Sequence, residues 1–369
     1  MKQMYEKSVV IINASLILLL SVLFFALEDK LFSDKENRTL QAVPSFTLQK
    51  LADGDYAKQT AKYLADQFPF RDTFVCLKAY SELTLAKREN NGIIYGKDGV
   101  LVPRVSIEND ILQQNINHIN DFSQKTGKQV FVAPLPAVID VTSEYLPKNY
   151  TTDSTEQIWQ KLDANIGKAQ AQILDLREPL NQDGTYYKTD HHYTTKGAYI
   201  TYCALSEKLG FVPKDESFFN VETATSDFCG TSMRSSGFYL ADKDTIHLYR
   251  YENDESFSVV ADGKTASLYD FDKLNTTDKY AVFLGGNHAR VDITSGAGDR
   301  EKLLVIRDSF ADSIAPFLAL HYDLILVDLR YYTDSLSQLV AQEGIDKVLV
   351  LENITELATA KNISILQKP

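Results

Sequence analysis

One apolar segment near the N-terminus constrains what this chain can fold into more than any other feature. Residues Ser8–Leu27, SVVIINASLILLLSVLFFAL, carry no charged side chain. An α-helix of about 20 residues spans about 30 Å, which is the thickness of the hydrocarbon core of a bilayer. A helix in the core of a soluble protein is a poor alternative, because no polar face interrupts the segment. We therefore predict a transmembrane helix at residues 8–27.

The flanking residues predict how that helix is oriented. Lys2 and Lys7 precede it, and positive charges favour the cytoplasmic side of a membrane. Residues 1–7 are then a cytoplasmic N-terminus, and everything after Glu28 lies outside the cytoplasm. A cleaved signal peptide is the alternative, but the sequence FFALED lacks small residues at the spacing of a cleavage site. The sequence thus favours a single-pass protein of the cell membrane held by a signal-anchor.

The overall composition excludes some classes of partner. The 369 residues have a formal net charge of −12 and no cluster of Lys and Arg, so nucleic-acid binding is not expected. The three cysteines, Cys76, Cys203 and Cys229, are too few and too scattered for a disulfide framework or a Cys-based metal site. Whether one pair bonds stays open, and Cys203 lies in an apolar helical stretch where a buried thiol is expected.

Residues 28–91 are predicted to form a helical stalk and lead-in segment. Asp34–Ser45 is polar, and helical apolar spacing runs from Leu48 to about Lys87. Pro69, within the sequence DQFPFRD, breaks that spacing.

From residue 92 onward the pattern becomes that of an α/β domain. Short apolar runs typical of buried strands occur at Ile93–Gly96, Gln129–Leu135, Ala171–Leu176, Lys302–Asp308, Tyr322–Leu329 and Asp346–Asn353. Helical stretches lie between several of them, at Asp110–Thr126, Ser154–Gln170, Thr195–Leu209, Phe310–Leu320 and Ser335–Gln342. Apolar strands that alternate with helices indicate a parallel sheet covered on both faces. We predict a three-layer α/β domain at residues 92–369 with a central parallel sheet.

A β-rich insertion is expected within that domain at about residues 218–292. Its strand-like pieces are TIHLYRY, SFSVV, TASLYD and KYAVFLG, and polar turns link them.

The first candidate for chemistry is Ser309, in the sequence LLVIRDSFADS. An apolar strand ends at Arg307 and a helix is expected from Phe310 onward. Ligands of open α/β sheets bind beyond the carboxyl ends of the strands, so Ser309 lies where a nucleophile is useful. The alternative is that Asp308 or Ser309 only caps the helix, since Asp and Ser are favoured N-cap residues.

The second candidate is the sequence TDHHYTTKGAY, Thr189–Tyr199. It holds two of the six histidines of the chain next to an aspartate. A serine nucleophile needs a base, and the base needs a carboxylate to orient it. Asp190 can accept the Nδ1 proton of His192 and leave Nε2 facing a serine, while His191 points elsewhere. The alternatives are a metal site of the kind found in DHH-type phosphoesterases and a polar turn before a helix, but no companion D-x-D or H-x-x-x-D motif accompanies the first.

Two further stretches offer substrate-binding groups. Asn287, in FLGGNHARVDI, follows two glycines and could donate a hydrogen bond to an oxyanion, although a Gly-Gly-Asn sequence is also an ordinary turn. Arg330 and Tyr331, in DLRYY, follow another strand end. They either bind substrate or pack over the sheet edge.

Taken together, these stretches resemble a known family, the DHHW proteins, which belong with the SGNH-like serine acyltransferases and esterases. The resemblance rests on ENRTLQAVP (Glu36–Pro44), DQFPFRD (Asp66–Asp72), ENNGIIYGKDGVLV (Glu89–Val102), TDHHYTTKGAY, GGNHA, IRDSFA and VDLRYY. It implies an SGNH-hydrolase-like α/β fold and a Ser-His-Asp triad formed by Ser309, His192 and Asp190. Tyr193 stands where the family name has Trp, in a position that implies packing or stacking on a sugar ring. The order of the triad, with Asp and His before Ser, agrees with the alginate-modifying O-acetyltransferases of this group.

The resemblance also implies an activity. We expect an extracytoplasmic O-acetyltransferase that acetylates a cell-surface or secreted bacterial polysaccharide through an acetyl-serine, without a metal or other cofactor. Acetyl-CoA is cytosolic, so a multi-spanning membrane acyltransferase is the expected acetyl donor. A carbohydrate acetylesterase with the same triad and a non-catalytic glycan-binding or assembly subunit remain alternatives. The sequence leaves the acceptor glycan and the oligomeric state open.

Overall fold

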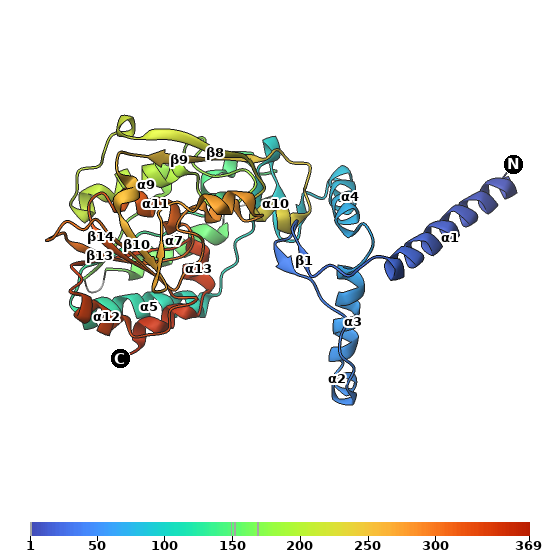
Figure 1. The fold of residues 1–369 in the computed structure, drawn as a ribbon, viewed down its shortest axis with the longest axis horizontal. Coiled ribbons are helices and arrows are strands. Elements are labelled where there is room, and N and C mark those ends of the chain that lie inside the picture. The colour runs from blue at the N-terminus through green and yellow to red at the C-terminus, as the bar shows by residue number, and fades with distance from the viewer. Residues whose placement is uncertain (1, 149, 151–152, 168–169) are drawn as a thin grey trace. The chain divides into compact units, whose positions relative to one another are not determined.

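The apolar N-terminal segment folds as one continuous helix, α1 (Lys2–Ala26) (Figure 1). The computed structural model describes residues 2–148, 150, 153–167 and 170–369. Within α1, the 22 residues Tyr5–Ala26 are long and apolar enough to cross a membrane. A signal-anchor and a signal peptide share these properties, so the helix fits either.

The chain divides into two units. The N-terminal unit comprises Met1–Lys87 together with the short segment Arg234–Leu240, and the α/β unit comprises Arg88–Met233 and Ala241–Pro369. The short segment belongs to the N-terminal unit because Phe238 stacks edge-on against Tyr80, with ring centroids 5.8 Å apart.

The N-terminal unit is helical, as its apolar spacing predicts. Its elements after α1 are β1 (Phe32–Ser33), β2 (Arg38–Thr39), α2 (Leu48–Ala52), α3 (Asp55–Asp66) and α4 (Arg71–Thr84). Pro69 lies in the break between α3 and α4. Two of the stretches on which the resemblance rests meet here, because Arg38 donates to both carboxylate oxygens of Asp66, at 3.0 and 2.6 Å. Asp66 is buried, and its hydrogen bonds with Arg38 hold the pKa of its carboxyl below its usual range.

The α/β unit contains an eight-stranded sheet whose order is β11-β10-β12-β14-β13-β15-β6-β7. The bounds of its strands are β6 (Val130–Val132), β7 (Ala171–Ile173), β10 (Ser258–Ala261), β11 (Lys264–Ala266), β12 (Arg290–Thr294), β13 (Lys302–Arg307), β14 (Asp323–Asp328) and β15 (Lys347–Leu351). The five strands from β14 to β7 in that order are mutually parallel. The prediction of apolar strands alternating with helices is therefore confirmed for this half of the sheet.

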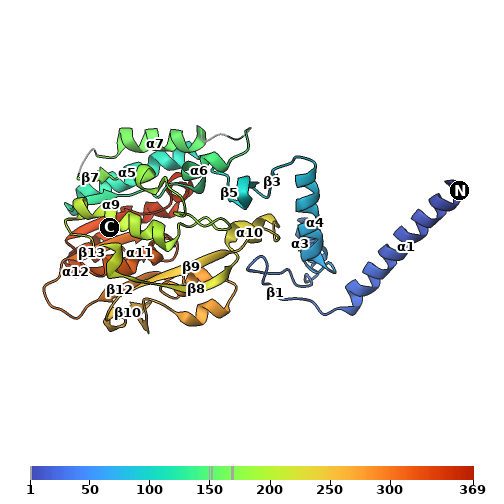
Figure 2. The ribbon, with the colours of Figure 1, turned by 90° about the horizontal axis from the view of Figure 1, so that it is seen from above.

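The prediction of a central parallel sheet holds only for these five strands, because the whole sheet is mixed. Strand β12 pairs antiparallel with β14, and β10 pairs antiparallel with both β12 and β11. These three strands come largely from the segment that we expected to form a β-rich insertion. Parallel edge strands expose unpaired N–H and C=O groups, and the inserted strands satisfy those of β14 by extending the sheet. Within the expected insertion, β8 (Asn220–Phe228) and β9 (Asp244–Arg250) form a two-stranded sheet separate from the central one, which runs as a long antiparallel pair (Figure 2).

Two other strand predictions are corrected. Residues Ile93–Tyr95 form β4, but it pairs with β3 (Glu89–Asn90) and β5 (Leu101–Pro103) in a three-stranded sheet and does not join the central sheet. Its partners lie within ten residues on either side, so local pairing is available at little entropic cost. The piece KYAVFLG begins with a 3₁₀ helix at Lys279–Val282, so it is not a strand.

Helices cover both faces of the sheet, with α5 and α12 on one face and α9 and α11 on the other (Figure 1). The bounds of the helices in this unit are α5 (Asn109–Thr126), α6 (Val138–Val141), α7 (Asp153–Asn165), α8 (Arg177–Leu180), α9 (Thr195–Leu209), α11 (Ala311–Leu318), α12 (Leu336–Glu343) and α13 (Ile354–Thr359). Helix α10 (Thr231–Ser236) lies where the chain passes from one unit to the other. The predicted helices that begin near residues 110, 154, 195, 310 and 335 are all present, with ends shifted by up to five residues.

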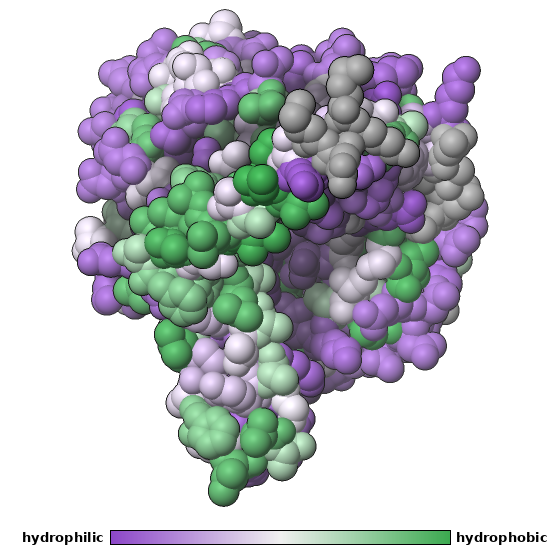
Figure 3. All heavy atoms as spheres, turned by 90° about the vertical axis from the view of Figure 1, so that its right-hand side faces the viewer, coloured by the Kyte–Doolittle hydropathy of each residue, from purple (hydrophilic) through white to green (hydrophobic). Residues whose placement is uncertain are grey.

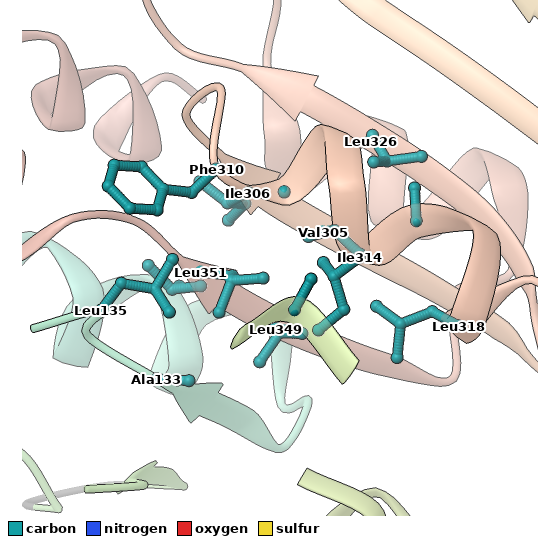
Figure 4. Close-up of a cluster of buried hydrophobic side chains, with 14 of the residues drawn as sticks. Ala133, Leu135, Val305, Ile306, Phe310, Ile314, Leu318, Leu326, Leu349 and Leu351 are labelled. Carbon is teal, nitrogen blue, oxygen red and sulfur yellow. The ribbon is translucent and has the colours of Figure 1, made fainter. Parts of the chain in front are cut away.

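The core between α11 and the sheet is apolar and closed. Ile314 and Leu318 of α11 lie over Val305 and Leu349 of the central strands, and all four are fully buried (Figure 4). This packing fixes α11, and with it the loop that joins β13 to α11.

Candidate active site

Ser309 lies in the short loop between β13 and α11, at the carboxyl end of the strand. Asp308 holds this loop, because its Oδ1 accepts from the Phe310 N–H at 2.9 Å and its Oδ2 accepts from the Asn353 N–H at 2.7 Å. The second bond ties the loop to the end of the neighbouring strand β15. Burial raises the pKa of the Asp308 carboxyl against these hydrogen bonds, which favour the charged form.

The helix-cap alternative does not account for Ser309, although Asp308 does accept from the Phe310 N–H at the start of α11. The N-cap of α11 is Phe310, and no side chain caps it. The hydroxyl of Ser309 is half-buried and meets a histidine instead.

That histidine sits on a hairpin-like loop formed by residues 185–194. The Thr194 N–H donates to the Thr185 carbonyl at 2.8 Å, and the Tyr187 N–H donates to the His192 carbonyl at 3.2 Å. Asp190 and His191 form the tip of this loop, and α9 begins just after it. The turn that we considered as a structural alternative therefore exists, and it also carries the candidate site residues.

The structure brings Asp190, His192 and Ser309 together in one chain of contacts. His192 Nδ1 lies 2.5 Å from Asp190 Oδ1, and His192 Nε2 lies 2.8 Å from Ser309 Oγ. The backbone N–H of His192 also donates to Asp190 Oδ1 at 3.0 Å. Both ring nitrogens of His192 are engaged, and this geometry allows Nε2 to take the proton of Ser309 while Asp190 orients the ring.

Electrostatic interactions keep the carboxylate of Asp190 charged. Burial alone raises the pKa of Asp190, but the two neighbouring imidazoles and its hydrogen bonds outweigh burial and hold that pKa well below its usual range. One of these bonds comes from the Thr231 N–H, which donates to Asp190 Oδ2 at 2.6 Å. A charged Asp190 stabilises the imidazolium that forms when His192 accepts a proton.

Aromatic rings fix the orientation of the His192 imidazole. The Tyr280 ring stacks on it with centroids 4.0 Å apart and planes 13° apart, and the Phe310 ring lies 4.7 Å away. Tyr280 is itself held by a hydrogen bond from its hydroxyl to Ser313 Oγ at 3.0 Å. A ring packed in this way loses little rotational freedom when it reacts.

His191 lies beside the Asp190, His192 and Ser309 contacts but is not part of them. Its Nδ1 is 3.6 Å from Asp190 Oδ1, and 39% of its side chain is exposed. The ligand atoms of Asp190, His191 and His192 fall within 4.8 Å of one another, close enough to share a metal ion. A metal there would compete with the contacts that His192 already makes to Asp190 and Ser309, because its ring has only two nitrogens.

Three supporting residues were missed by the sequence reasoning. Asp244, on β9, accepts from the backbone N–H groups of Lys188 and Thr189, at 2.9 and 2.8 Å, and so holds the approach to Asp190. Gly230 packs directly on the loop, since a Cβ there would lie 2.3 Å from the Cβ of Asp190. Thr231 supplies the N–H described above. Gly230 and Thr231 lie about 40 residues after the Thr189–Asp190 pair, and Asp244 lies 55 residues after Thr189. No local sequence pattern marks any of the three as part of the site.

Asn287, Arg330 and Tyr331 form a group of their own. Arg330 donates to Asn287 Oδ1 at 3.2 Å and pairs with Asp328 at 2.6 Å. Tyr331 is 51% exposed, and the Arg330 guanidinium lies 5.5 Å from its ring centroid. Their hydrogen-bond partners are thus one another and Asp328, not the Asp190, His192 and Ser309 chain.

Tyr193 lies in the core, which favours packing over stacking on a sugar, the two roles considered for it. Its side chain is fully buried, and its hydroxyl donates to the Phe310 carbonyl at 2.8 Å. No face of the ring is open to a substrate. Its role is to pack beside the Ser309 loop.

Comparison with known proteins finds a matching family model and curated relatives. The family model described as "DHHW protein" matches residues 84–328. A relative named "Probable alginate O-acetylase AlgJ" from Pseudomonas putida is 25% identical over 183 residues, which are 46% of this chain and 47% of that protein. The chain spans about half the length of the curated relatives that it matches.

Two solved structures share the fold. A DHHW family protein from Eubacterium siraeum matches with a TM-score of 0.61 at 22% identity, over 76% of this chain and 96% of that one. PatB1 of Bacillus cereus, solved with a sulfonyl adduct, matches with a TM-score of 0.64 at 20% identity, over 75% of this chain and 98% of that one. At these identities the likeness concerns the fold.

Proposed function

The chain belongs to the DHHW protein family, and from that premise we propose that it is a serine-dependent O-acetyltransferase acting on a polysaccharide outside the cytoplasm. The observation that carries the proposal is the chain of contacts from Asp190 Oδ1 to His192 Nδ1, at 2.5 Å, and from His192 Nε2 to Ser309 Oγ, at 2.8 Å. Ser309 is the nucleophile and His192 is the general base. Asp190 orients the imidazole of His192 and stabilises the imidazolium that forms when it accepts a proton.

The reaction has two halves. In the first, Ser309 Oγ attacks the acetyl carbonyl carbon and its proton passes to His192 Nε2. The bond from that carbon to the donor then breaks, and the donor leaves with the proton. In the second half, a sugar hydroxyl gives its proton to His192 and attacks acetyl-Ser309, so that the acetyl group passes to the sugar oxygen and Ser309 regains its proton.

The names of the relatives and the proposed location support a choice of acceptor and donor. The alginate O-acetylases are named for the acetylation of a polysaccharide, and this chain takes a related acceptor. Helix α1 acts as a retained anchor in the cell membrane, with the α/β unit on the outer side. Because acetyl-CoA is cytosolic, the donor is a multi-spanning membrane acyltransferase that carries the acetyl group across.

The first test asks whether Ser309 is an activated nucleophile. The detergent-solubilised full chain is incubated with a sulfonyl fluoride, and the modified residue is located by mass spectrometry. Labelling at Ser309 that disappears in His192→Ala supports the proposal. The matched control is Ser256, which is exposed, and equal labelling of Ser256 and Ser309 would contradict it.

The second test separates transfer from hydrolysis. The rate at which the chromophore is released from a chromogenic acetyl ester is measured for wild type, Ser309→Ala and the control Ser256→Ala. It is measured first in water and then with a panel of oligosaccharides. Acetylated sugar in the mass spectrum supports a transferase. Ester cleavage with no acetylated sugar in the whole panel would make the protein an acetylesterase, and equal rates for wild type and Ser309→Ala would leave a non-catalytic glycan-binding subunit.

A further inference from the structure

Exposed apolar side chains are concentrated in the short stretch that follows α1. Among the described residues, 12 large hydrophobic side chains between residues 28 and 87 are exposed, whereas the whole α/β unit exposes only five. Hydrophobic atoms gather on the N-terminal unit, including the tip that α2 forms (Figure 3). A surface of this kind is normally covered, since soluble proteins seldom leave large apolar patches in water.

Five of these side chains form one patch on α3, α4 and the turn between them. We call Leu64, Phe68, Phe70, Phe74 and Leu77 the apolar patch; their exposed fractions lie between 40% and 60%. Positions 74 and 77 are spaced to lie on one stripe of α4, and Phe70 immediately precedes that helix. The rings of Phe68 and Phe74 touch with centroids 5.6 Å apart. The patch is therefore continuous across the turn.

The backbone is strained where it presents this patch. Phe70 has φ 58°, in the left-handed region, and it follows Pro69 directly. A bulky residue rarely adopts this conformation. The Phe70 side chain is nevertheless 60% exposed, and strained residues of this kind cluster at binding sites.

Contacts within the N-terminal unit bind the C-terminal end of α1 to the same place. The Phe24 and Tyr63 rings pack edge-on with centroids 5.8 Å apart. The side chain of Gln67 donates to the Lys30 carbonyl at 3.0 Å and accepts from the Lys30 N–H at 2.9 Å. Gln67 immediately precedes Phe68, so the apolar patch begins beside the end of α1.

The net charge of the sequence also differs between residues 28–87 and the residues that follow. Residues 28–87 contain nine basic and nine acidic side chains, whereas residues 88–369 contain 27 basic and 40 acidic ones. Anionic headgroups repel an acidic surface. They do not repel the N-terminal stretch, whose charges balance.

We propose that the apolar patch lies in the headgroup region of the membrane that α1 crosses, as a second, interfacial anchor. The proposal rests on the retention of α1 that the proposed function assumes. A lipid surface is favoured over a protein partner because a spanning α1, tied to α3 by the contact of Phe24 with Tyr63, brings the bilayer to the patch with no further component. Aromatic side chains at such a boundary are typical of membrane interfaces.

The test uses tryptophan fluorescence of the full chain in phosphatidylcholine vesicles. Trp159 is the only tryptophan and is 1% exposed, so the wild-type chain supplies the baseline. Phe70→Trp and Leu77→Trp are compared in plain vesicles and in vesicles of brominated lipid, which quenches only nearby indoles. Phe25→Trp, on α1, is the positive control, and Phe271→Trp, which is 47% exposed on the α/β unit, is the matched negative control.

The expected result is that bromolipid lowers the added emission of Phe70→Trp and Leu77→Trp at least twofold, with a blue shift, and leaves Phe271→Trp unchanged. Equal emission of Phe70→Trp in both vesicles, with Phe25→Trp quenched, would overturn the proposal and favour a protein partner. If Phe25→Trp is not quenched either, α1 does not span and the proposal fails with it. Ester cleavage by Phe70→Ser in detergent should equal that of wild type, so failure of the proposed function is detected separately.

Discussion

His192 Nε2 lies 2.8 Å from Ser309 Oγ, although 117 positions of sequence separate the two residues. The first lies on a loop before α9 and the second lies at the end of a central strand. The contact exists only because α9 and α11 pack on the same face of the sheet.

The two adjacent histidines are predicted to differ in importance. His192→Ala removes the base and should lower the rate of ester cleavage by about 10³-fold or more. His191→Ala removes only one of the groups that lower the pKa of Asp190, so its rate should stay within about tenfold of wild type. The rates are measured with a chromogenic ester, with and without a chelator. A larger loss for His191→Ala, or inactivation by the chelator, would favour the metal site over the triad.

Gly230 is predicted to tolerate no side chain. A Cβ there would lie 2.3 Å from the Asp190 Cβ and 2.4 Å from the Thr189 carbonyl oxygen, and neither atom belongs to the mobile end of a side chain. Gly230→Ala should therefore displace Asp190 and lower the rate by at least about 10²-fold. Gly298→Ala is the control, because its Cβ meets nothing within 4 Å. Equal rates for the two variants would show that the loop can move aside.

Replacing Tyr193 by either Phe or Trp is predicted to lower the free energy of unfolding. Tyr193→Phe leaves the Phe310 carbonyl without the hydroxyl that now donates to it at 2.8 Å, and should cost about 1 kcal/mol of unfolding free energy. Tyr193→Trp restores the residue of the family name, but the larger ring must enter a fully buried space, and overpacking should cost about 1–3 kcal/mol. Chemical denaturation measures both, and the exposed Tyr331→Phe is the control. A stabilised Tyr193→Trp would mean that the core has room for the larger ring.

The buried carboxyl of Asp312, on α11, predicts a pH-dependent stability. Burial raises its pKa to about 7, although the Arg307 guanidinium at 2.8 Å opposes the shift. Between about pH 4 and 7 the unfolded chain loses this proton and the folded chain keeps it. The unfolding free energy of wild type should therefore fall over that range relative to Asp312→Asn, by at most about 4 kcal/mol, and then level off.

This prediction is checked by denaturation of wild type and Asp312→Asn in detergent at several pH values from 4 to 8. Asp242→Asn, on an exposed carboxyl, is the control and should follow wild type. A difference between wild type and Asp312→Asn that does not change with pH would contradict the assignment.

Local sequence patterns were enough to predict part of the fold. Val305, Leu326 and Leu349 lie in runs of apolar residues that only a buried strand explains, and the helices between them follow the 3.6-residue spacing. Which strands pair is not a local property. The apolar pattern of residues 258–294 does not reveal that β12 crosses to β14 and makes the sheet mixed, because antiparallel and parallel strands bury the same side chains.

The candidate site divides in the same way. Asp190 and His192 are two positions apart, and their hydrogen bond is a short-range feature that the D-x-H pattern predicts. Gly230, Asp244 and Tyr280 belong to other segments, and nothing in their own neighbourhood marks them as supports of Asp190 and His192. Their close packing depends on the whole fold.

The sequence by itself determined that the chain has an apolar N-terminal helix, an α/β part and the three residue types of a serine triad, because periodicity, charge and short motifs are written along the chain. Only the tertiary structure decided that the loop carrying Asp190 and His192 reaches Ser309, that Tyr193 is buried and that the sheet is mixed. These outcomes depend on which distant surfaces meet. Loop closure and packing set those contacts, and they are properties of the folded chain as a whole.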